Sequence, residues 1–196
     1  MPASLAEPPP MITLVGLSGS LRKASLNTAL LRAAAREMPP GVRFVEATLR
    51  DVPLYDGDLE AAEGLPAAVV RLKEQLAGAD ALLLATPEYN NAMPGVLKNA
   101  IDWMSRPAAD IPRVFGAKPV ALMGASPGNF GTILSQASWL GVLRTLEMRL
   151  WSGGRMMLSA AHRAFDAEGN LVNAPDRERL RRFVHGFVDS LGPAGS

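Results

Sequence analysis

Hydroxyl side chains, one glycine and one arginine are concentrated between Ser18 and Asn27. The hydroxyls belong to Ser18, Ser20 and Ser25, Arg22 lies between them, and Asn27 adds an amide. Hydroxyl and amide groups donate hydrogen bonds, and the guanidinium fork of arginine matches phosphate oxygens. The stretch has no cysteine, no G-x-G-x-x-G and no G-K-[ST], which excludes a thiol phosphatase, a dinucleotide fingerprint and a nucleoside-triphosphate P-loop. We interpret it as a loop for a terminal phosphate monoester; the alternative is a solvated, serine-rich turn that caps a helix.

The chain on either side of this loop indicates how it is held. An apolar run predicts a buried strand over Ile12–Leu17, and the leucine spacing that follows predicts a helix over Ser25–Met38. Backbone N–H groups at a helix start are free, and the helix dipole favours an anion there. Gly16 and Gly19 would let the backbone bend and approach a ligand.

A second loop follows the continuous apolar run Ala81–Thr86, which predicts a strand covered on both faces. Pro87, Glu88, Tyr89 and Asn90 bring polar and aromatic groups to the end of this strand. Backbone groups here are suited to the edge of a flat heterocycle, with the tyrosine packed beside it. The alternative is a loop with a capping asparagine and one surface tyrosine.

A third loop follows the predicted strand Pro119–Ala125 and carries Ser126, Gly128 and Gly131. Its glycines would permit close approach of the backbone to a ligand. The predicted helix Thr132–Met148 then adds a second positive dipole end, which would favour negative charge developing on a nearby ring. The alternative is a plain connection between a strand and a helix.

Strands and helices alternate along the whole chain. The other predicted elements are strands Val42–Ala47 and Arg155–Ser159, helices Pro66–Leu76, Pro94–Met104 and Pro175–Ser190, and a polar loop over Asp51–Glu63. Five such alternations predict an α/β fold, a parallel sheet with helices on both faces. Ligands of such sheets bind beyond the carboxyl ends of the strands, near the point where strand order reverses. The three loops leave such ends, which strengthens the phosphate interpretation.

The composition limits the class of protein. With 196 residues, 48% of them hydrophobic, we expect one domain over 11–190, a disordered proline-rich tail over 1–10 and a short tail over 191–196. A formal net charge of +1, without a basic stripe, gives no support for nucleic-acid binding. The absence of cysteine and the presence of only two histidines argue against a disulfide or a metal site. Without a long apolar run or a secretory signal we expect no membrane partner and a cytoplasmic location.

The motifs resemble those of the NADPH-dependent FMN reductase family, the flavodoxin-like quinone, chromate and azo reductases. The family pattern G-S-x-R-x-x-S-x-N is present at Gly19–Asn27, and P-E-Y-N followed by P-x-x-L-K-N-A-I-D-W at Pro87–Asn90 and Pro94–Trp103. The third pattern, S-x-G-x-x-G-G, is partial, because Thr132 replaces its second glycine; Gln136 also matches. The resemblance covers Met11 to Ser190.

The resemblance implies a flavodoxin-like three-layer sandwich whose five-stranded parallel sheet has the order 2-1-3-4-5, with FMN bound without covalent attachment. It implies these cofactor-binding residues: Ser18, Ser20, Arg22, Ser25 and Asn27 for the phosphate, Leu26 in the same loop, and Pro87, Glu88, Tyr89, Asn90, Ser126, Gly128 and Gly131 around the ring. It also implies a homodimer or homotetramer, and we expect Pro94–Pro112, with Trp103 and Met104, at an interface. For Asp102 and Arg106 we favour a salt-linked helix surface.

The implied activity is transfer of a hydride from NADPH or NADH through FMN to a quinone or a similar small-molecule acceptor, in ping-pong order. No side chain is assigned a catalytic role. Two alternatives stay open: an FMN electron carrier, and a flavin- or nicotinamide-sensing protein without significant turnover. Electron carriers are often strongly acidic, so the net charge of +1 disfavours the first. The sequence names neither the acceptor nor a preference between NADPH and NADH.

Overall fold

A computed structural model describes residues 11–192, so the predicted tail over 1–10 and most of that over 191–196 lie outside the described residues. The strands are β1 (Ile12–Ser18), β2 (Val42–Ala47), β3 (Ala81–Ala85), β4 (Pro119–Ala125), β5 (Arg149–Leu150) and β6 (Met156–Leu158). They form one parallel sheet in the order β2-β1-β3-β4-β5, with β6 also paired to β4. The predicted strand order is confirmed, and β1 is where the order reverses.

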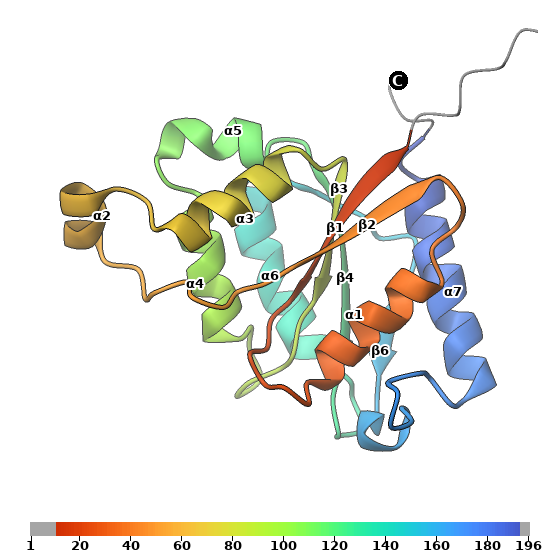
Figure 1. Cartoon of the computed structure of the whole chain (residues 1–196). Coiled ribbons are helices and arrows are strands. Elements are labelled where there is room, and N and C mark those ends of the chain that lie inside the picture. The colour runs from red at the N-terminus through yellow and green to blue at the C-terminus, as the bar shows by residue number, and fades with distance from the viewer. Residues whose placement is uncertain (1–10, 193–196) are drawn as a thin grey trace, which may run out of the picture.

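Helices cover both faces of this sheet (Figure 1). The α-helices are α1 (Leu26–Arg36), α2 (Gly57–Glu63), α3 (Ala67–Ala77), α4 (Gly95–Met104), α5 (Ile111–Val114), α6 (Ile133–Thr145) and α7 (Ala174–Asp189); the 3-10 helices are η1 (Ala108–Asp110) and η2 (Ala161–Arg163). One hydrophobic core packs α1 and α7 on one face, and a second packs α3, α4, α5 and α6 on the other. The described residues therefore form a parallel sheet with helices on both faces, as the alternation predicts, and this is the three-layer sandwich that the resemblance implies.

The central strands supply apolar side chains to both cores. Leu14 of β1 and Leu83 of β3 face the α1–α7 side, whereas Val15 and Leu82 face the other side. Successive side chains of a strand point to opposite faces, so a strand covered on both faces must be apolar throughout. Every residue of β3 is buried, as its continuous apolar run predicts.

The prediction of a polar loop over Asp51–Glu63 is wrong for its second half, which forms α2. Asp56 begins this helix by accepting a hydrogen bond from the N–H of Asp58 at 2.9 Å. No residue of α2 is buried. The helix therefore lacks the apolar periodicity on which sequence-based recognition depends.

The fifth position of the sheet also differs from the prediction, because two short strands fill it. Strand β5 pairs with the start of β4, and β6 pairs with its end. Between them the ring of Trp151 packs on α7, with centroids 5.2 Å from Phe183 and 5.6 Å from Phe187. A Cβ at Gly153 or Gly154 would lie within 2.9 Å of the indole. The chain between β5 and β6 thus lies outside the sheet, with the partly buried ring of Trp151 packed against α7.

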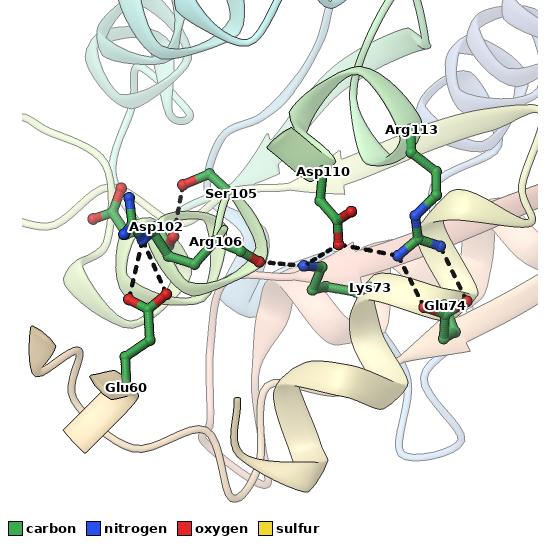
Figure 2. A network of polar contacts seen from close by, with 8 residues as sticks. All are labelled: Glu60, Lys73, Glu74, Asp102, Ser105, Arg106, Asp110 and Arg113. Carbon is green, nitrogen blue, oxygen red and sulfur yellow. Dashed lines mark hydrogen bonds and ion pairs between the residues drawn. The ribbon is translucent and has the colours of Figure 1, made fainter. Parts of the chain in front are cut away.

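Ion pairs fix the segment that joins α4 to α5 (Figure 2). Lys73 of α3 is only 2% exposed, and its Nζ donates to Asp110 Oδ2 at 2.7 Å and to the carbonyl oxygen of Arg106. The guanidinium of Arg106 bonds the carboxylate of Glu60, which confirms the surface role favoured for Arg106. This hydrogen bond raises the pKa of Arg106. Helices α2 and α3 and the 3-10 helix η1 are thus tied together through Arg106 and Asp110.

Asp102 likewise lies in an ion pair on the helix surface, with Lys98 at 2.6 Å, and both side chains are partly exposed, as favoured from the sequence. Trp103 and Met104 are buried in the core. Their side chains pack inside the domain, so they offer no exposed apolar surface to the expected interface over Pro94–Pro112.

Lys73→Met is expected to lower the free energy of unfolding by about 1.5–3 kcal/mol, the range for hydrogen bonds to charged groups. Methionine fills similar space but donates no hydrogen bond to Asp110 or Arg106. Urea unfolding measures the loss. Lys98→Met is the matched control, because Lys98 is 38% exposed in its pair with Asp102 and surface pairs contribute about 0–1 kcal/mol. Equal losses in the two variants would contradict the assignment.

The effect of Lys73 should depend on pH in a defined direction. Its hydrogen bond, together with that of Arg113, holds the pKa of Asp110 below its ordinary value of 3.8. A carboxyl group with a lowered pKa in the folded state stabilises the protein fully above the ordinary value, and this stabilisation is lost as the pH falls through the lowered value. The difference between Lys73→Met and the wild-type protein should therefore shrink in acid.

Candidate functional site

Three loops meet at the carboxyl ends of the central strands, along the lower edge of the sheet in Figure 1. The N–H of Gly19 bonds the carbonyl oxygen of Ala85, and the N–H of Thr86 bonds that of Met123, both at 2.9 Å. These bonds continue the pairing of β1 with β3 and of β3 with β4 into the loops. The loops with unusual side chains therefore lie next to one another, as predicted.

The first loop ends at the start of α1. Ser25 caps this helix by accepting a hydrogen bond from the N–H of Thr28 at 3.1 Å. Thr28 Oγ1 donates to Ser18 Oγ at 2.9 Å, so Thr28, which the motif does not include, joins both ends of the loop. Helix geometry leaves the N–H groups of Leu26 and Asn27 without partners inside the helix. The loop thus presents hydroxyl and backbone donors together.

A pocket of about 130 Å³ opens beside this loop. Its lining consists of Ser18, Ser20, Leu21, Arg22, Lys23, Thr28, Arg32, Glu46, Ala47, Thr48, Leu49 and Arg50. Arg32 is paired with Glu46, the only acid of the lining, at 2.8 Å, and Arg50 donates to the carbonyl oxygen of Leu21 at 3.1 Å. Arg22 and Lys23 are exposed. Hydroxyls and an excess of cations suit a phosphate dianion; Lys23 and Arg50 were not among the predicted residues.

Asn27 has a role that its place in the motif does not reveal. Its Nδ2 donates to the carbonyl oxygen of Ala125, and its Oδ1 accepts from the N–H of Ala125, both at 2.9 Å. The side chain is only 4% exposed. It therefore joins the start of α1 to the end of β4, and its backbone N–H is the group that points out of the helix start.

Gly16 and Gly19 are required by packing inside the protein. A Cβ at Gly16 would lie 2.2 Å from the ring of Phe44, and one at Gly19 would lie 2.9 Å from both Pro87 and Pro94. The expectation that these glycines admit a ligand is therefore wrong for Gly16, which lies inside β1. At Gly19 the absent side chain lets the first and second loops touch.

The second loop makes a tight turn that presents Tyr89. The backbone N–H and carbonyl groups of Tyr89 form hydrogen bonds with those of Ala92, both at 3.1 Å. Between them, Asn90 and Asn91 have positive φ angles of 51° and 61°. Two left-handed residues in succession define a type I′ turn, which asparagine tolerates. Pro87 is buried, whereas Tyr89 is 44% exposed. An aromatic face is thus available at this edge of the sheet.

Glu88 points back to the start of α6. Its Oε2 accepts hydrogen bonds from the N–H groups of Leu134 at 2.9 Å and Ser135 at 3.1 Å. The positive end of α6 is therefore occupied by a carboxylate, which contradicts the expectation that it is free to act on a ring. Thr132, where the family has glycine, is fully buried, and its hydroxyl accepts a hydrogen bond from Gln136 Nε2 at 3.2 Å. Its side chain points into the protein.

The third loop is held from the side of β6. The N–H groups of Ala160 and Ala161 bond the carbonyl oxygens of Gly128 and Ser126 at 2.9 Å. Gly131 has a φ of +61°, and a Cβ there would lie 2.7 Å from Met157, so only glycine fits. Next to Gly131 stands Phe130, which is 79% exposed; a lone phenylalanine gave no signal in the sequence.

Residues 12–163 match the NADPH-dependent FMN reductase family. The chain belongs to this family. It is 45% identical over 171 residues to an NAD(P)H-dependent FMN reductase of Pseudomonas aeruginosa, covering 87% of this chain and 90% of the relative. It is 39% identical over 170 residues to a 2-hydroxy-1,4-benzoquinone reductase of Burkholderia, covering 87% and 91%.

The fold of this chain is also similar to that of a solved flavoenzyme structure. FerB, a flavoenzyme NAD(P)H:(acceptor) oxidoreductase of Paracoccus denitrificans, superimposes with a TM-score of 0.83 at 35% identity, covering 92% of this chain and 97% of FerB. Among the helices of residues 11–192, none combines the length and hydropathy of a membrane-spanning segment.

The residues present fit FMN. Hydroxyls, the N–H groups at a helix start, and cations that make no ion pair within residues 11–192 match its phosphate monoester. Tyr89 and Phe130, exposed on the second and third loops, match a flat aromatic ring.

Proposed function

We propose that this protein is an FMN-dependent oxidoreductase that takes a hydride from NADPH or NADH and passes electrons to a quinone or a similar small-molecule acceptor. The observation that carries the proposal is the cationic, hydroxyl-lined pocket on the same sheet edge as two loops with exposed aromatic rings. Membership of the FMN reductase family supports it. So do relatives named as an FMN reductase and as a benzoquinone reductase.

In this proposal the first loop binds the phosphate. Ser18, Ser20 and Ser25 donate hydroxyl hydrogen bonds, and Arg22 supplies charge; the backbone N–H groups of Leu26 and Asn27 complete the set. The start of α1 adds its positive dipole end. These groups anchor one end of the cofactor and leave its other end to the two remaining loops.

The ring would lie between the loop that contains Pro87, Glu88, Tyr89 and Asn90 and the loop that contains Ser126, Gly128 and Gly131. Bound FMN supplies two-electron chemistry, accepting a hydride and returning electrons to an acceptor. The protein side chains bind and orient the ring. No described side chain is assigned as a nucleophile or as a general acid.

The names of the relatives favour an enzyme over the two alternatives, an electron carrier and a sensing protein. We expect purified protein to be yellow, to bind FMN more tightly than FAD in a fluorescence titration, and to consume NADPH when a quinone is added. Tighter binding of FAD would contradict the phosphate-monoester site. Tight FMN binding without quinone-dependent loss of NADPH would instead identify a carrier or a sensor.

We also propose a homodimer or homotetramer with Pro94–Pro112 at an interface, and a cytoplasmic location. Resemblance to the family supports the assembly, and the charged network of Figure 2 gives this segment a defined shape. Light scattering on the same preparation distinguishes an oligomer from the 20.8 kDa monomer.

A further inference from the structure

Helix α6 is capped by a residue from another loop. Helices commonly begin at a residue whose side chain accepts a hydrogen bond from the first turn. Thr132 stands at that position but makes no such bond, because its buried hydroxyl accepts from Gln136. Glu88, which lies 46 and 47 positions before Leu134 and Ser135, accepts from their N–H groups instead. The cap therefore depends on the contact between the second loop and α6.

The carboxylate of Glu88 also changes the electrostatic charge at the start of α6. The start of a helix carries about half a positive elementary charge, and an acid there cancels it. Glu88 is half-buried, so water screens its carboxylate less than that of a surface acid. If the proposed function is correct, the flavin ring lies between the loop that holds Glu88 and the loop that contains Ser126, Gly128 and Gly131, which leads directly into α6.

This charge matters because reduction changes the charge of the ring. A hydride adds two electrons and one proton, so the ring gains one negative charge. An uncapped helix start nearby would stabilise that charge, whereas a carboxylate at the helix start opposes it. We propose that Glu88 is a positioning residue with two effects: it fixes the geometry of the ring loops, and it lowers the reduction potential of the bound flavin.

Two substitutions separate these effects. Glu88→Gln keeps a side-chain oxygen that can accept from the two N–H groups but removes the charge, so it should raise the potential while leaving FMN bound. We expect the ratio of affinities for reduced and oxidised FMN to rise about three- to tenfold, a shift of about 15–30 mV for a two-electron couple. Glu88→Ala removes charge and cap together, and should weaken FMN and riboflavin by the same factor.

The potential is measured by spectrophotometric titration of the bound flavin against a reference dye. Glu63→Gln is the matched control, because it removes the same charge from the exposed helix α2 and should leave the potential unchanged. Thermal unfolding without flavin should show Glu88→Ala less stable than Glu88→Gln, since only the glutamine retains a capping oxygen.

The outcomes are distinct. An unchanged or lowered potential in Glu88→Gln, with FMN bound, overturns the electrostatic effect while the proposed function stands. Wild-type affinity for riboflavin in Glu88→Ala overturns the positioning effect. If the wild-type protein binds no FMN, the proposed function fails and the inference fails with it.

Discussion

Gly124→Ala is expected to lower the free energy of unfolding by about 3 kcal/mol, near the upper end of the usual cost of overpacking. A Cβ at Gly124 would lie 1.8 Å from Thr132 Oγ1 and 2.6 Å from the carbonyl oxygen of Thr86. Gly124 lies in β4, which pairs with β3 on one side and with β5 and β6 on the other. Because the strand is held on both sides, it cannot move away cheaply. Urea unfolding followed by tryptophan fluorescence measures the loss.

Two further variants test the reason for this loss. Adding Thr132→Gly removes one of the two close contacts, so the double variant should recover part of the stability lost in Gly124→Ala; the contact with Thr86 remains. Gly128→Ala is the control, since the nearest atom to a Cβ there is 3.8 Å away, and its effect should stay within about 0.5 kcal/mol. Wild-type stability in Gly124→Ala would show that the Thr132 side chain does not occupy this space.

Arg22→Ala is expected to weaken FMN binding by about tenfold to a hundredfold and to change riboflavin binding little. Arg22 lines the cationic pocket, and a charge-assisted hydrogen bond contributes about 1.5–3 kcal/mol, where each 1.4 kcal/mol is a factor of about ten. Riboflavin lacks the phosphate and so cannot make this bond. Isothermal titration with the two ligands measures both affinities.

The comparison of ligands separates a phosphate contact from a general effect. Arg43→Ala removes the same charge from an exposed position in β2 that does not line the pocket, and both affinities should stay as in the wild-type protein. Equal weakening of FMN and riboflavin by Arg22→Ala would mean that Arg22 shapes the loop without binding the phosphate. Quinone-dependent turnover per bound flavin should change little, because the phosphate is remote from the reacting part of the ring.

Local patterns in the sequence were sufficient to predict most of the helices and strands. The bounds of β2 and β4 are as predicted, and an entirely apolar β3 identified a strand covered on both faces. Such patterns are informative because burial on two faces, helix periodicity and helix starts each constrain neighbouring residues directly. Helix α2 was missed for the same reason: with no buried residue, it has no apolar pattern.

The sequence also located the three loops of the site, since strand ends of a parallel sheet meet at one edge. What each side chain does there was decided by tertiary structure. Asn27 bonds Ala125 across 98 positions, Glu88 caps a helix that begins at Ile133, and Phe44 fills the space beside Gly16. The type of a polar or small residue in a motif shows which hydrogen bonds it can make or how much space it leaves. Only the folded chain determines which distant group takes them, because that depends on which segments pack together.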